Sequence, residues 1–145
     1  RLRPIALENM LTELRKRRIS KDLPCVNEKN LERYLKILTL FRNVCAHNER
    51  LYSFRTQIDF PDTILHQKLN IPKKGNQYFS GKRDLFGLVI AFRYLLPRQD
   101  FLEFKRILIG IINKYTKSSG QISESSLLHM LGFPTNWKNI TRYHI

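Results

Sequence analysis

The sequence predicts an all-α fold, a bundle of helices interrupted by one long and partly irregular connection. Apolar residues recur at intervals of three and four in several segments, which is the period of a helix that buries one face. No segment alternates convincingly between apolar and polar residues, and no internal repeat is present. Because 145 residues with 42% hydrophobic content suffice for one core, we predict a single domain over residues 1–145.

The first predicted helix begins near Pro4, a residue type that suits a first helical turn. Its apolar stripe consists of Leu7, Met10, Leu11 and Leu14. The helix ends in a basic run at residues 15–18, where positive charge is favourable beside the carbonyl end of the helix dipole. A solvated face is the simpler explanation of this run, and an RNA contact is the alternative. Residues 22–24 (Asp-Leu-Pro) then break the helical pattern.

The second predicted helix starts after Asn27, whose side chain can cap its first turn. Glu32 and Lys36 stand one turn apart and can form an ion pair on its exposed side. The expected core face consists of Leu31, Leu35, Leu38 and Phe41, with Tyr34, Ile37 and Val44 beside them. This helix leads directly into the polar string that follows Phe41.

Residues 51–82 form the long connection, in which regular structure is hard to find. We expect only a short helix within residues 62–69, with Ile64, Leu65 and Leu69 facing inward. The aromatic residues of the segment are Tyr52, Phe54, Phe60, Tyr78 and Phe79. Basic residues are mixed with them at Lys73, Lys74 and Lys82, and Arg83 follows directly. Such a mixture suits the binding of single-stranded RNA, in which the rings stack on bases and the lysines pair with phosphates. The rings could equally pack into the core and hold the connection against the domain.

A phosphate-binding loop is excluded in this segment. Gly75 and the Gly-Lys pair at residues 81–82 resemble its glycines and lysine, but their spacing is one residue too long. Arg83 also stands where the motif requires Ser or Thr.

The second half of the chain predicts two more long helices. Residues 83–96 are almost entirely apolar, which indicates a central helix that stops at Pro97. Asp100 and Glu103 resemble a capping box at the start of a long helix that ends near residues 118–120.

A short last helix is predicted to start at Ser123 and to close at Gly132 and Pro134. Its apolar residues are Leu127, Leu128 and Leu131. We expect Trp137 to pack back onto the domain as an anchor, because a large aromatic side chain gains most from burial.

The charge of the chain points to an anionic partner. There are 26 basic and 12 acidic residues, which gives a net charge of +14 and a pI near 10.2. The excess is greater after Asp62, where 13 basic residues accompany 4 acidic ones. A nucleic acid is the first candidate for the partner, and an acidic membrane surface is the second.

The cysteine content and the lack of a signal peptide predict a reduced, cytoplasmic protein. Cys25 and Cys45 form no CxxC pair, so we expect neither a disulfide nor a zinc site. No signal peptide opens the chain, and its longest apolar run, residues 85–96, contains Arg93 and is too short to span a bilayer. The first residue is not methionine, which suggests a segment of a longer protein.

The polar string after Phe41 holds the most distinctive group of side chains. On an ideal helix Asn43, His47 and Arg50 share one face, because they are spaced by four and then three residues. Arg42 points elsewhere, since five residues correspond to a rotation of roughly 140°. Arg42 and His47 could therefore meet on one substrate only if the helix frays, or if a second copy supplies half of the site.

These residue types suit the cleavage of RNA. A histidine can act as general acid or base near neutral pH, and arginine offers a fork of donors to a phosphate. RNA carries its own nucleophile, the 2′-hydroxyl, and the sequence shows no carboxylate cluster for magnesium and no zinc spacing. The alternative is a helix-end histidine among solvated arginines. The other histidines, His66, His129 and His144, lack a charged constellation and are expected to be surface or core residues.

At these residues the sequence resembles a known family. Residues 42–47 (RNVCAH) fit the Arg-x4-6-His signature of the HEPN superfamily, and residues 42–52 (RNVCAHNERLY) look like the hallmark of the Abi-like, or abortive infection, proteins of bacteria. Residues 131–137, with Gly132, Phe133, Pro134 and Trp137, are similar to the closing motif of that family. The resemblance extends over most of the chain and matches the C-terminal half of the family.

The resemblance implies a HEPN-like helical domain of which two copies face each other and share a composite site. It also implies metal-independent endoribonuclease activity in anti-phage defence or a toxin–antitoxin pair, leaving a 2′,3′-cyclic phosphate and a 5′-hydroxyl. By position, Arg42 and His47 would be the catalytic pair and Asn43 their polar companion. Many members have a second histidine after the first, where this chain has Asn48.

We therefore expect RNA and a second copy of the chain as partners, with no membrane, no cofactor and no metal. The residues expected to bind RNA are Arg50, Lys73, Lys74, Lys82 and Arg83. Two alternatives remain at this point. The chain could be a non-catalytic module that holds a non-coding or guide RNA, or a basic helical regulator that binds DNA, although no clear recognition helix stands out.

Overall fold

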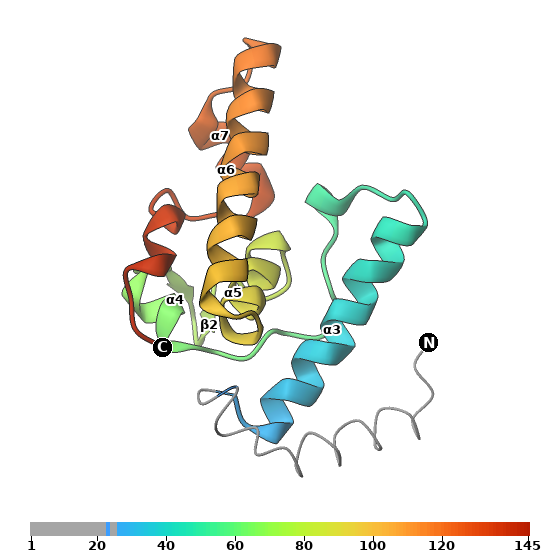
Figure 1. Ribbon diagram of the computed structural model, residues 1–145, viewed down its shortest axis with the longest axis vertical. Coiled ribbons are helices and arrows are strands. Elements are labelled where there is room, and N and C mark those ends of the chain that lie inside the picture. The colour runs from blue at the N-terminus through green and yellow to red at the C-terminus, as the bar shows by residue number, and fades with distance from the viewer. Residues whose placement is uncertain (1–22, 24–25) are drawn as a thin grey trace.

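The computed structural model describes residue 23 and residues 26–145, and over these residues the all-α prediction is confirmed (Figure 1). The helices are α3 (Glu28–Ala46), α4 (Ile64–Lys68), α5 (Leu85–Leu95), α6 (Arg98–Ser119) and α7 (Glu124–Leu131). Two short 3₁₀ turns, η1 (Leu51–Ser53) and η2 (Trp137–Thr141), accompany them. The predicted first helix, its basic run at residues 15–18, and Cys25 lie outside the described residues.

The helices are arranged around α5 and α6 (Figure 1). The long helix α6 packs against α5 and α7, and α3 crosses the molecule on the other side of α5. The turn η1 contacts both α3 and α7, so the segment after α3 is held between two helices. Of the described helices, none combines the length and the apolar character needed to cross a bilayer.

Helix α3 supplies one wall of the core. Its buried residues are Leu31, Tyr34, Ile37, Phe41 and Val44, which recur at helical spacing. Asn27 caps the helix by accepting a hydrogen bond from the Asn30 amide at 2.8 Å, and the predicted Glu32–Lys36 ion pair is present. Leu35 and Leu38 are only half-buried, so the buried stripe is centred slightly to one side of the predicted one.

Helix α5 is the central helix, as its composition predicts, and it is buried along most of its length. Its N-cap is Asp84, one residue after the predicted start at Arg83. The predicted capping box at Asp100 and Glu103 is wrong, because α6 begins directly at Arg98 after Pro97. Leu96, directly before Pro97, has the extended backbone that a following proline favours (ψ 146°), so α5 ends there and α6 starts two residues later.

The connection between α3 and α5 is more regular than predicted. It contains η1, α4 and a small antiparallel hairpin, β1 (Lys73–Lys74) with β2 (Gln77–Tyr78). The side chain of Ile64, expected to face inward, is 43% exposed, whereas Leu65 and Leu69 are buried as predicted. Of the rings in this segment, Phe60 and Tyr78 join the core, while Tyr52 (43% exposed) and Phe79 (67% exposed) face solvent.

The closing motif at residues 131–137 joins the end of α7 to α5 and η2. Gly132 ends α7 in the left-handed conformation, at φ 79°, close to the carboxylate of Asp84. Phe133 packs between Phe86 and Trp137, with ring centroids 5.1 and 5.2 Å away. Trp137 is fully buried, which confirms its predicted role as an anchor.

Candidate functional site

The polar string after Phe41 begins on the last turn of α3 and continues through a defined helix-ending turn. The His47 amide donates to the Asn43 carbonyl at 3.0 Å, the Asn48 amide to Cys45 at 3.3 Å, and the Glu49 amide to Val44 at 3.0 Å. This is the hydrogen-bond pattern of a Schellman motif, which needs a left-handed residue just beyond the helix. Asn48 fills that position with φ 56°.

This turn changes the expected geometry of one residue. Asn43 and His47 remain one turn apart, because His47 is the C-cap of α3. Arg50 lies beyond the turn in extended backbone, with φ −75° and ψ 95°, so the prediction that it shares their helical face is wrong. The physical reason is that α3 ends at Ala46 rather than continuing through Arg50.

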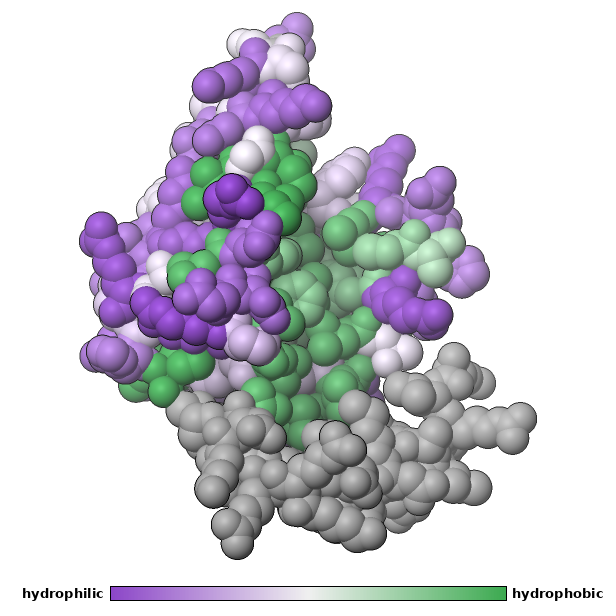
Figure 2. All heavy atoms as spheres, in the orientation of Figure 1, coloured by the Kyte–Doolittle hydropathy of each residue, from purple (hydrophilic) through white to green (hydrophobic). Residues whose placement is uncertain are grey.

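The side chains of the string are presented to solvent from a fixed backbone. Arg42, His47 and Arg50 are exposed and Asn43 is half-buried, whereas the neighbouring Phe41 is in the core. The ring of Phe41 packs edge-on against Phe54, with centroids 5.2 Å apart. In Figure 2, hydrophilic residues surround the C-terminal end of α3.

The rotation argument for Arg42 and His47 holds in a single copy. Helix α3 is intact through Ala46, so Arg42 sits on regular helix and does not swing toward His47 by fraying. Among the described residues, no hydrogen bond joins the two side chains. By helix geometry, residues 42 and 47 leave the axis of α3 roughly 140° apart.

A further cation near this end of α3 escaped the sequence analysis. Arg55 is exposed, and its Nη1 donates to the carbonyl of Phe54 at 2.9 Å. The Thr56 amide donates to the Arg83 carbonyl at 2.9 Å, which joins this segment to the start of α5. In the sequence, the available signal was a basic residue directly after the aromatic residue Phe54. In the structure, the ring of Phe54 packs on Phe41 of α3.

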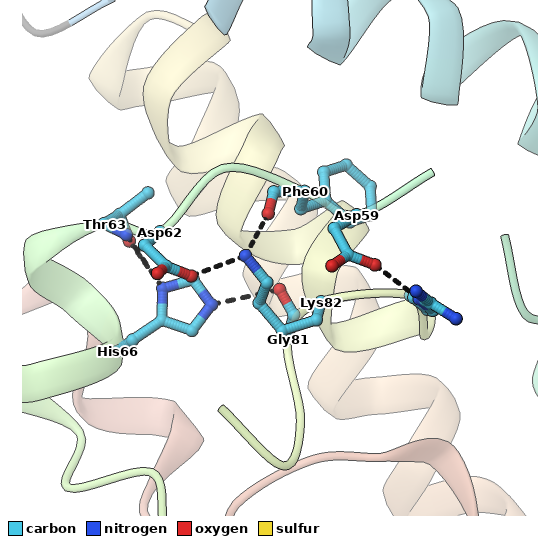
Figure 3. Close-up of polar contacts among 8 residues, drawn as sticks. Asp59, Phe60, Asp62, Thr63, His66, Gly81 and Lys82 are labelled. Atoms are coloured by element: carbon cyan, nitrogen blue, oxygen red, sulfur yellow. Dashed lines mark hydrogen bonds and ion pairs between the residues drawn. The ribbon is translucent and has the colours of Figure 1, made fainter. Parts of the chain in front are cut away.

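Lys82 and Arg83, both expected to bind RNA, are engaged with carboxylates of the chain (Figure 3). Lys82 is buried, and its Nζ donates to the Phe60 carbonyl and to Asp62. Arg83 donates through Nε to Asp59. Because the ammonium of Lys82 is directed into the protein, we leave Lys82 out of any RNA-binding surface.

His66 is a fully buried structural histidine beside Lys82 (Figure 3). Its Nδ1 accepts a hydrogen bond from the Thr63 amide at 3.1 Å, and its Nε2 lies 3.0 Å from the Gly81 carbonyl. An amide can only donate and a carbonyl can only accept, so the ring is neutral with its proton on Nε2. Burial lowers the pKa of His66, which favours the same neutral form.

Lys73 and Lys74 lie on the hairpin, which Figure 1 shows near α4 and separate from the C-terminal end of α3. Both are exposed, and the Lys73 ammonium stands 4.6 Å from the centre of the Tyr78 ring. The sequence-predicted site residues therefore fall in three places: the end of α3, the two residues before the N-cap of α5 (buried Lys82 and exposed Arg83), and the hairpin.

Comparison with known protein families finds a match for part of the chain. Residues 5–53 match the model of a family described as Abi-like protein. This is about a third of the chain; it includes the whole string at residues 42–52 and excludes the closing motif at residues 131–137. No curated protein and no solved structure matches the chain. The match supports the Abi-like resemblance for the part of the chain that carries Arg42 and His47.

Proposed function

We propose that the protein is a metal-independent endoribonuclease whose reaction centre is built from Arg42 and His47. The observation that carries this proposal is the position of both residues at the end of α3, exposed on a backbone anchored by Phe41, within the segment that matches the Abi-like family. The family description points to abortive infection, so we place the activity in an anti-phage or toxin–antitoxin system.

In the proposed reaction the ribose 2′-oxygen attacks the adjacent phosphorus while the bond from phosphorus to the 5′-oxygen breaks. The products are a 2′,3′-cyclic phosphate and a 5′-hydroxyl. His47 either takes the proton of the 2′-hydroxyl, with water protonating the leaving 5′-oxygen, or protonates the leaving 5′-oxygen while water takes the proton of the 2′-hydroxyl. The guanidinium of Arg42 stabilises the negative charge that develops on the phosphate oxygens. Asn43, one turn before His47, orients the imidazole or binds a phosphate oxygen.

Two copies of the chain complete the site in this proposal. Five residues along an intact helix correspond to a rotation of roughly 140°, so in this proposal the arginine of one copy acts with the histidine of the other. Mixing the Arg42→Ala and His47→Ala proteins tests this arrangement. A mixed dimer contains one intact site, so activity is expected to return on mixing. Two inactive proteins that stay inactive after exchange of subunits would contradict a shared site.

The nuclease assay compares wild type, His47→Ala and His129→Ala on single-stranded and folded RNA in EDTA. His129 is an exposed histidine on α7 and serves as the matched control. We expect His47→Ala to lose about 100-fold or more of the cleavage rate, the usual contribution of a general acid or base, and His129→Ala to lose none. Equal cleavage by wild type and His47→Ala would remove His47 from the mechanism.

One observation favours a second function, a module that holds RNA without cutting it. The hairpin that carries the exposed Lys73 and Lys74 is separate from the C-terminal end of α3, so RNA could be held there with no contact to Arg42 and His47 (Figure 1). This alternative predicts salt-sensitive RNA binding that is unchanged by His47→Ala, and no cyclic-phosphate product.

A further inference from the structure

The hairpin carries an exposed ring in a segment that holds only positive charge. Between Asp62 and Asp84 the chain has five basic residues and no acidic one. Lys82 and Arg83 are neutralised by Asp62 and Asp59, which leaves Lys68, Lys73 and Lys74. Within the described part of the chain, these three exposed lysines have no carboxylate partner.

Phe79 is the most exposed large hydrophobic residue described, at 67%, yet its backbone is held on both sides. Its amide donates to the Pro72 carbonyl at 2.8 Å. The next residue before it, Tyr78, is buried against the His66 ring with centroids 4.7 Å apart, and the residue after it, Ser80, is also buried. A large ring that faces water from a fixed backbone contributes little to packing and is preorganised for a partner.

The register of the hairpin places Phe79 beside Lys74. Lys73 pairs with Tyr78, and Lys74 pairs with Gln77. Side chains alternate along a strand, so Tyr78 and Lys73 share the inner face, while Gln77, Lys74 and Phe79 belong to the outer face. Lys74 and Phe79 are diagonal neighbours on that face, a separation that long and aromatic side chains bridge.

We infer that the outer face of the hairpin is a second RNA subsite, in which Phe79 stacks on an unpaired base and Lys74 pairs with a neighbouring phosphate. The inference rests on the proposed function for the identity of the polymer. Every base has a π-face, so such a site takes single strands with little sequence preference. Bases in a duplex are stacked on one another and are not available to Phe79, so the subsite selects single-stranded RNA.

The test measures binding in the His47→Ala background, so that no RNA is cut, with a fluorescent single-stranded oligonucleotide and the matching duplex as probes. We expect Phe79→Ala to weaken single-strand binding by roughly 5-fold to 150-fold, as the loss of one stacked base does, and Phe79→Trp to retain it. Ile111→Ala is the matched control, because Ile111 is also exposed (59%) but lies on α6. Its affinity is expected to equal that of the parent.

Lys74→Gln is expected to weaken binding and to reduce the slope of log affinity against log salt by about 0.7, the value for one phosphate contact on a single strand. Unchanged single-strand affinity of Phe79→Ala would overturn the inference, as would an equal loss with the duplex. These results are separate from the nuclease assay. If Phe79→Ala cleaves RNA normally with an unchanged KM, the subsite is excluded and the nuclease proposal stands. If RNA binding depends on Phe79 but the wild type cleaves no RNA, the nuclease proposal is excluded and the subsite stands.

Discussion

Asn48 determines how the motif leaves helix α3. Its left-handed backbone, at φ 56°, allows the amides of Asn48 and Glu49 to bond the last carbonyls of the helix. Asparagine tolerates this conformation better than most residues, and only glycine adopts it freely. The second histidine implied by the family resemblance would have to adopt the same conformation here, so Asn48 suits the turn that the chain makes.

Substitution at Asn48 is expected to separate backbone from side-chain effects. Asn48→Ala should lower the free energy of unfolding by about 1 kcal/mol relative to Asn48→Gly, because an alanine Cβ is strained in the left-handed region. Chemical denaturation of the two variants measures the difference. An alanine variant as stable as the glycine variant would show that α3 ends differently.

His66 makes the stability of the fold depend on pH. Burial lowers the pKa of His66 below its ordinary value of about 6.5, so the folded state binds fewer protons than the unfolded state in this region. Stability is therefore expected to fall as the pH drops through about 6.5 toward the folded pKa, with a slope of at most about 1.4 kcal/mol per pH unit. Denaturation of wild type and His66→Gln between about pH 7.5 and 5 tests this. The variant should lose this slope, and identical slopes would exclude His66 as the cause.

At the scale of elements, α5 helps to position α3, the helix that carries Arg42, through the ring of Phe60. Gly87 on α5 lies so near the Phe60 ring that an added Cβ would stand 2.3 Å from it. The same ring packs on Phe41 of α3, with centroids 6.2 Å apart. Asp84 caps α5 and accepts from the amides of Gly87 and Gly81, while burial raises the pKa of its carboxyl group.

Two alanine substitutions in helices are expected to have opposite effects. Gly87→Ala should lower the unfolding free energy by about 1–3 kcal/mol, because Phe60 has to move out of a packed core. Gly110→Ala, in exposed α6, meets no atom within 4 Å and should raise it by roughly 0.5–1 kcal/mol. Thermal melting of both variants measures the signs. A stabilising Gly87→Ala would contradict the contact with Phe60.

The sequence predicts elements well where local chemistry marks their ends. Asn27 and Ser123 cap helices as expected, and Gly120 and Gly132 end them in left-handed conformations. The hairpin was not predicted, because each strand has only two residues and cannot show an alternating pattern. Its formation depends instead on the burial of Tyr78 against His66.

At the scale of the whole molecule, the candidate site was only partly predictable. The string from Arg42 to Arg50 is local, so its position at a helix end could be inferred from the sequence alone. The partners of Lys82 and Arg83 lie 20 and 24 residues earlier in the chain, and no local pattern reveals such pairs. The net charge of +14 predicts an anionic partner but not which cations are available to it.

The two exposed basic regions are expected to contribute independently to the binding of a long RNA. The end of α3 and the hairpin are separate parts of the molecule, so the losses caused by Arg50→Gln and Lys74→Gln should add in the double variant. Titration of a long single-stranded RNA with the three variants at fixed salt measures this. If the double variant binds RNA with the same affinity as the weaker-binding single variant, one RNA does not contact both regions.

The most direct test of the central claim is a substrate lacking its own nucleophile. A single-stranded RNA is prepared with one 2′-deoxy residue immediately 5′ of a mapped cleavage position, and cleavage is followed in EDTA. Our account predicts that cutting stops at that linkage and continues at the others, with 2′,3′-cyclic phosphate ends at every remaining cut. Cutting at the deoxy linkage at the normal rate would contradict attack by the ribose 2′-oxygen and, with it, the roles assigned to Arg42 and His47.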